Sequence, residues 1–96
     1  MPHLDHFRRD VKTCYIRITH DAEYWDGVRA VLNHFGRSTA YNPDTREFAV
    51  PNNTRSWVRL SMIFPDEWAF IEDTNAWDVS FTPDPSPPPS PKSAEP

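Results

Sequence analysis

The sequence is poor in glycine and cysteine and lacks a long apolar run, and each shortage excludes a class of protein. Its 96 residues include only two glycines, which excludes a glycine-rich phosphate-binding loop. The single cysteine, Cys14, cannot form an internal disulfide, so a disulfide-stapled secreted scaffold is excluded. Residues 1–10 lack the apolar segment of a signal peptide, and no stretch approaches the length of a membrane span. We therefore expect a cytoplasmic protein with no membrane partner.

Aromatic residues, prolines and acidic residues are abundant, and their distribution divides the chain. Thirteen aromatic side chains, four of them tryptophan, supply apolar area for a small core. Seven of the eleven prolines follow Thr82, and the segment 65–96 carries seven acidic side chains against one basic one. The net charge is −4. We expect a flexible N-terminal arm at 1–11, a single α+β domain at 12–81 and a disordered Pro/Ser-rich tail at 82–96.

An alternating strand followed by an amphipathic helix is the clearest structural signal. Apolar and polar side chains alternate from Cys14 to Thr19, which is typical of a strand with one buried face. Asp21 is a good N-cap, and Gly36 suits the residue that ends a helix. Apolar residues between them recur at spacings of three and four, so we predict a helix at about 21–35. Its predicted buried stripe contains Trp25, Val28, Leu32 and Phe35, widened by Tyr24 and Val31.

The rest of the chain predicts strands joined by turns. The Asn-Pro-Asp turn at 42–45 predicts a hairpin between 37–41 and 47–50. Alternation predicts a further strand at 57–64, and short apolar runs favour strands at 68–72 and 77–81. Pro65, followed by two acids, is also a typical helix opening, which would give a second strand–helix–strand unit. The predicted class is α+β, with one helix packed on a mostly antiparallel sheet of about five strands.

One five-residue pattern occurs twice, at 15–19 and 57–61: aromatic, β-branched, arginine, aliphatic, hydroxyl. If both segments are neighbouring strands, their aromatic and arginine side chains share one exposed face. Such a face suits a protein interface, in which Trp, Tyr and Arg are preferred anchors. It also suits stacked bases and phosphates of single-stranded nucleic acid. The third interpretation is ordinary packing across strands.

Catalytic and metal-binding sets are sparse. Cys14 is predicted to lie on the core side of a strand, where a thiol is usually inert. His20 and Asp21 could act as a base and its orienting carboxylate, but helix capping by Asp21 explains the pair more simply. His3 and His6 have no third ligand nearby. We expect no enzyme activity, no metal and no cofactor.

We expect a small non-catalytic binding protein that occupies the surface of a partner protein. Its size and acidity are analogous to those of small phage or mobile-element inhibitors, which dock on nucleic-acid-handling proteins. The first alternative is an RNA or single-stranded DNA binder, and the second is a structural subunit that self-assembles, for example as a homodimer. The predicted contact residues come from both repeats and from the acidic end: Tyr15, Arg17, Trp57, Arg59, Glu67, Trp68, Glu72 and Asp73.

Overall fold

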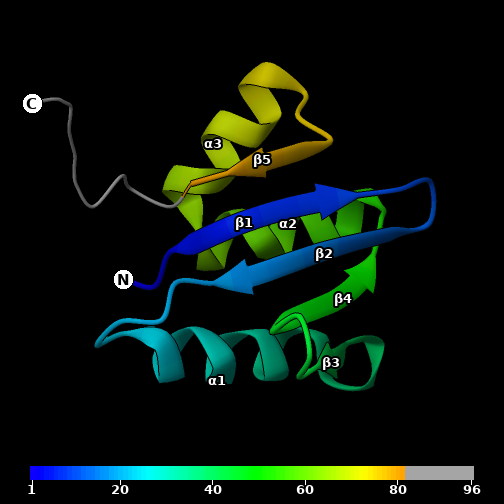
Figure 1. Cartoon of the computed structure of the whole chain (residues 1–96). Coiled ribbons are helices and arrows are strands. Elements are labelled where there is room, and N and C mark those ends of the chain that lie inside the picture. Colours follow the sequence, from blue (N-terminus) through cyan, green and yellow to red (C-terminus); the bar gives the residue numbers. More distant parts are fainter. Residues whose placement is uncertain (82–96) are drawn as a thin grey trace, which may run out of the picture.

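The computed structural model describes residues 1–81, which form one antiparallel sheet and three α-helices (Figure 1). The sheet has five strands in the order β3-β4-β2-β1-β5. Figure 1 shows α2 behind the sheet, with α1 and α3 toward its two edges. The predicted α+β class is therefore confirmed. The elements in chain order are β1 (Leu4–Arg9), β2 (Thr13–Ile18), α1 (Tyr24–Phe35), the short 3-10 helix η1 (Gly36–Ser38), β3 (Ala40–Asn42), β4 (Glu47–Pro51), α2 (Thr54–Ile63), α3 (Pro65–Thr74) and β5 (Asp78–Ser80).

The core lies between the helices and one face of the sheet. Strand β2 alternates as predicted, with Cys14, Ile16 and Ile18 buried and Tyr15 and Arg17 on the opposite face. The other face of the sheet, which we call the open face, carries polar and charged side chains. The helices and neighbouring strands complete the buried cluster with Leu4, Phe7, Val28, Val31, Phe35, Phe48, Val50, Leu60, Ile63, Phe64, Trp68 and Ile71.

Strand β1 corrects the predicted N-terminal arm. Residues 4–9 pair with β2 on one side and with β5 on the other, so this segment is internal to the sheet. The register shifts between Leu4 and His6, which places an extra residue, Asp5, in the strand. This bulge interrupts the period of two, so the alternation that usually marks a strand is hidden in the sequence.

Helix α1 confirms the predicted helix but begins at Tyr24 rather than at Asp21. Asp21 does not cap it: its side chain accepts a hydrogen bond from the Glu23 N–H at 2.9 Å, which orders the preceding turn. Gly36 has a positive φ of 51° and donates its N–H to the Leu32 carbonyl, so the predicted glycine stop is confirmed.

The buried stripe of α1 is narrower than predicted. Val28, Val31 and Phe35 are buried, but Trp25 and Leu32 are exposed. A helix at the edge of a two-layer fold covers the sheet with one side only, so the flanks of a wide apolar arc remain outside.

Two predicted strands are helices. The segment predicted as a strand at 57–64 belongs to α2, whose N-cap Asn53 accepts a hydrogen bond from the Ser56 N–H at 2.8 Å. The segment predicted at 68–72 belongs to α3, which begins at Pro65 as the alternative interpretation required. These helices cover the sheet that the predicted strands would have extended.

The hairpin and the last strand agree with the sequence. Strands β3 and β4 pair across the turn, where the Asp44 N–H donates to the Asn42 side chain at 2.9 Å. Strand β5 lies within the predicted segment 77–81. The predicted tail at 82–96 lies outside the described residues. Within residues 1–81, no helix has the length and apolar character needed to cross a membrane.

Candidate functional site

The two copies of the repeated pattern do not share a face. Tyr15 and Arg17 lie on the open face of β2, whereas Trp57 and Arg59 lie on α2, behind the sheet. Residues two positions apart on a helix are rotated by about 200° around its axis, so even Trp57 and Arg59 point to different sides of α2. Trp57 donates its indole N–H to the Asn52 side chain at 2.9 Å, whereas Arg59 lines a cavity beside η1. The aromatic–arginine face predicted from the repeat is therefore wrong.

An ion pair occupies the centre of the open face. Arg8 donates two hydrogen bonds to the buried Glu47 carboxylate, at 2.9 and 3.0 Å, and its guanidinium lies 3.9 Å from the centre of the Tyr15 ring. The hydrogen bond from Arg8 lowers the pKa of Glu47, and the same bond raises the pKa of Arg8. The Arg8 guanidinium therefore already has partners within the chain, namely the Glu47 carboxylate and the Tyr15 ring.

A second set of charges extends this network. The Arg17 Nε donates to Asp5, the bulge residue of β1, at 2.6 Å, and Arg46 approaches the other oxygen of the same carboxylate at 3.8 Å. His6 contacts Asp78 at 2.8 Å, which ties β1 to the edge strand β5. The open face is consequently a set of mutually neutralising charges rather than a free basic platform for nucleic acid.

The four contact residues predicted within 65–77 lie on α3 in different environments. Trp68 is buried and packs edge-to-face on Phe7, with ring centres 5.8 Å apart, so it is a core residue. Glu67 accepts a hydrogen bond from His3 at 3.0 Å. Glu72 and Asp73 are exposed. Of the eight predicted contact residues, three line one small cleft of about 140 Å³ between α2 and α3: Trp57, Trp68 and Glu72.

The groups considered as catalytic candidates from the sequence are buried or in contact with neighbouring groups. Burial raises the pKa of Cys14 to about 11, and its thiol donates to the Asn52 side chain at 3.3 Å. The His20 ring packs edge-to-face on Tyr24, while the Asp21 side chain accepts a hydrogen bond from the Glu23 N–H. Among residues 1–81, no three His, Cys, Asp or Glu side chains are grouped as a metal site would require.

The most distinctive surface is an apolar groove where α1 lies beside the β3–β4 hairpin. Three of its side chains are large and substantially exposed: Trp25 at 64%, Leu32 at 48% and Tyr41 at 44%. The cavity between them measures about 260 Å³. We call this surface the aromatic groove, and its lining consists of Tyr24, Trp25, Val28, Leu32, Tyr41 and Phe48.

Ring packing gives the aromatic groove a defined shape. The Tyr24 and Trp25 rings meet edge-to-face with centres 5.2 Å apart, and Tyr41 lies 4.7 Å from Phe48 on the next strand. Burial, together with the neighbouring Tyr41, raises the pKa of Tyr24, so that hydroxyl stays neutral at physiological pH. Because β3 is an edge strand, nothing within residues 1–81 pairs with its outer side. The groove is thus uncharged, walled by rings and open on one flank.

Sequence reasoning missed this groove because it assigned Trp25 and Leu32 to the core. A signal was present: six large apolar residues at 24–35 form an arc wider than one sheet edge can cover. Comparisons with protein-family models, with curated proteins and with solved structures find no match to this chain, so its function is inferred from geometry alone.

Proposed function

We propose that this protein is a non-catalytic cytoplasmic binding protein that occupies the surface of a partner protein through its aromatic groove. The observation that carries the proposal is the exposure of Trp25, Leu32 and Tyr41 around a single apolar cavity. Large rings held in place by their neighbours lose little conformational freedom on binding, which is why Trp and Tyr serve as interface anchors. The partner would insert an apolar side chain between α1 and β3.

The charge pattern supports a protein partner over nucleic acid at this groove. Within residues 1–81 no arginine, lysine or histidine lines it, and Arg46, the cation that acts on Tyr24, is paired with Asp5. The arginines of the open face are paired with Asp5 and Glu47, so they do not offer an unpaired charge to a phosphate either. Apolar burial is therefore the main contribution that the groove can make to binding.

Affinity capture with a matched pair of variants tests this proposal. Trp25→Ala with Leu32→Ala removes two exposed apolar side chains from α1, and Val58→Ala with Met62→Ala removes two from α2. Captures from the native host lysate would use the wild-type chain and both double variants, with and without nuclease. We expect one partner protein to be retained by the wild type and by the α2 variant, in a nuclease-resistant form, and to be lost by the α1 variant.

Folding of each variant is checked by far-ultraviolet circular dichroism before capture. Retention of every partner by the folded α1 variant would contradict the proposed role of the groove. Recovery that disappears with nuclease would instead favour the nucleic-acid alternative, and recovery of the chain itself would favour self-assembly.

A further inference from the structure

Three arginines differ from the others in having no partner within residues 1–81. Arg8, Arg17, Arg29 and Arg46 each form an ion pair with an Asp or Glu. Arg9 lies over the Trp77 ring and donates to Asn75 at 2.9 Å. The chain has 14 acidic residues against 10 Lys and Arg, so a shortage of acids does not explain unpaired arginines. The three without an ion pair or hydrogen bond in the described chain are Arg37, Arg55 and Arg59.

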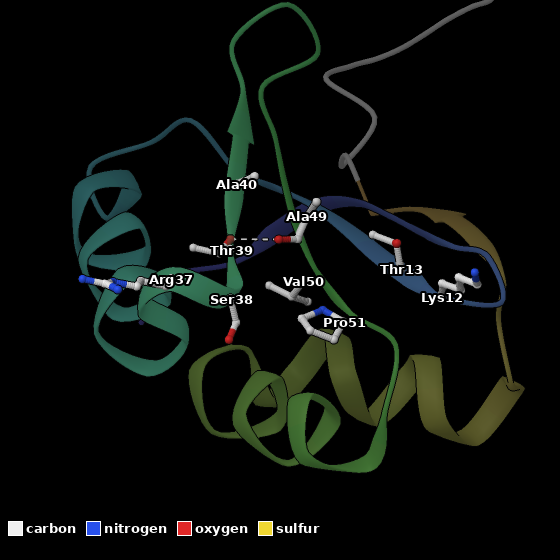
Figure 2. Close-up of a pocket in the computed structure, with 9 residues that line it drawn as sticks. All are labelled: Lys12, Thr13, Arg37, Ser38, Thr39, Ala40, Ala49, Val50 and Pro51. Atoms are coloured by element: carbon white, nitrogen blue, oxygen red, sulfur yellow. Dashed lines mark hydrogen bonds between the residues drawn. The ribbon is translucent and has the colours of Figure 1, made fainter.

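Two of these three arginines line one cavity, beside the end of η1. Arg55 and Arg59, one turn apart on α2, line a cavity of about 270 Å³ together with Ser38 of η1. Figure 2 shows Ser38 directed toward α2 from the end of η1, whereas the neighbouring Arg37, which lines the adjoining cavity, extends its guanidinium away from Ser38. Lys12 lies on the far side of that adjoining cavity, away from Arg37 (Figure 2). We call Ser38, Arg55 and Arg59 the arginine corner.

The placement of these arginines opposes the stability of α2. Like charges at positions i and i+4 repel each other on a helix, which applies to Arg55 and Arg59. Arg55 also lies in the first turn, where the helix dipole disfavours a cation, and this turn contains no acidic residue. By contrast, α1 and α3 both have acids in their first turns. No carboxylate lines the cavity, so nothing in its wall offsets the repulsion.

We propose that the arginine corner binds a phosphate group carried by a small molecule. Guanidinium groups donate paired hydrogen bonds to phosphate oxygens, and the Ser38 hydroxyl can add a further donor. The net charge of −4 repels an extended polyanion. A long nucleic acid needs a track of several phosphate contacts, whereas one phosphate needs only this corner. The site is separate from the aromatic groove and does not depend on it.

Thermal unfolding in the presence of named anions tests the site. Inorganic phosphate, pyrophosphate and adenosine 5′-monophosphate would be titrated against chloride at equal ionic strength. We expect each phosphate compound, but not chloride, to raise the melting temperature by mass action. Arg55→Gln with Arg59→Gln should weaken binding at least about tenfold, because it removes the charged donors but keeps two helix-forming side chains.

The matched control removes two arginines elsewhere. Arg29→Gln with Arg46→Gln lowers the net charge by the same amount and should leave phosphate binding within about twofold of the wild type. If the Arg55→Gln, Arg59→Gln double variant does not fold, the single variants Arg55→Gln and Arg59→Gln test the same cavity, and each should weaken phosphate binding. The proposal would be overturned if the Arg55→Gln, Arg59→Gln variant bound phosphate as tightly as the wild type. It would also be overturned if no phosphate compound had an effect beyond that of chloride.

A single-stranded oligonucleotide without terminal phosphates forms the last arm of the test. Binding tighter than that of pyrophosphate, with an affinity that falls steeply with salt, would show that the corner recognises a nucleic-acid backbone. That result would overturn the assignment to a small phosphorylated molecule. Absence of oligonucleotide binding, with pyrophosphate bound, would support it.

Discussion

Glu47 shows how much of this structure depends on a single side chain. It is buried on β4, and its partner Arg8 comes from β1, two strands away in the sheet. The pair links residues 39 positions apart, and His6 approaches the same carboxylate at 3.9 Å. No local pattern in the sequence reveals such a pairing, because opposite charges distant in the chain have many equally plausible partners.

The acid dependence of stability should therefore change when Glu47 loses its charge. Its pKa is lower in the folded chain than the ordinary value of 4.5, so its ionised form adds stability above that pH. This contribution is lost as pH falls below 4.5 through the folded-state pKa. We expect Glu47→Gln to cost about 1 kcal/mol at pH 7 and progressively less in acid. The cost is low for a charged pair because Arg8 is 43% exposed and can be rehydrated.

Urea denaturation of the wild type and Glu47→Gln at several pH values between 3 and 7 measures this difference. Glu72→Gln is the matched control, because it removes an exposed acid of α3 and should follow the wild-type curve closely. A constant gap between wild type and Glu47→Gln at every pH would show that packing, and not charge, causes the loss.

Helix α2 explains why one element was assigned the wrong structure. From Trp57 to Phe64 its residues alternate well enough to fit a strand, and a run this short does not decide between the two periods. Asn53 was the available signal, since an N-cap three residues before Ser56 is typical of a helix start. Strand β1 was missed for the opposite reason: it is a real strand, but the bulge at Asp5 disrupts the alternation that would have revealed it.

Alanine substitutions on α2 separate its helical burial from the predicted strand. A strand places Val58, Leu60 and Met62 on one face, so all three truncations would cost similar amounts. The helix buries Leu60 and exposes Val58 and Met62. We expect Leu60→Ala to cost about 2–5 kcal/mol and the other two less than about 0.5 kcal/mol, measured by denaturant unfolding. Similar costs for all three would require a different assignment of this segment.

For the molecule as a whole, the sequence predicted the class of fold better than its connections. Antiparallel pairing followed from the short turns, and the buried face of β2 followed from its alternation. The layer of helices was underestimated, since two segments that extend the sheet in the prediction cover it in the structure. The aromatic groove and the arginine corner depend on this layering, so neither could be assembled from local patterns.

Residues 82–96 should be dispensable for folding. All fifteen buried apolar side chains of the described chain lie between Leu4 and Ile71, and β5 ends at Ser80. A chain that stops after Thr82 should therefore unfold within about 2 °C of the full chain, measured by circular dichroism. A clearly lower midpoint would mean that the removed segment stabilises the domain.

The antiparallel return of β5 along β1 brings together two parts of the chain that are far apart in sequence. The Phe81 N–H donates to the Asp5 carbonyl at 2.9 Å. In Figure 1, β1 begins and β5 ends at the side of the molecule where the N-terminus is drawn. The start of α2 and the end of η1 lie at the opposite side. Any polypeptide fused before Met1 or after Phe81 would therefore leave from one side. The same proximity makes the domain suited to circular permutation, with the old ends joined and new ends opened in the 43–46 turn. It also suits insertion into a surface loop of a host protein, with the arginine corner facing outward.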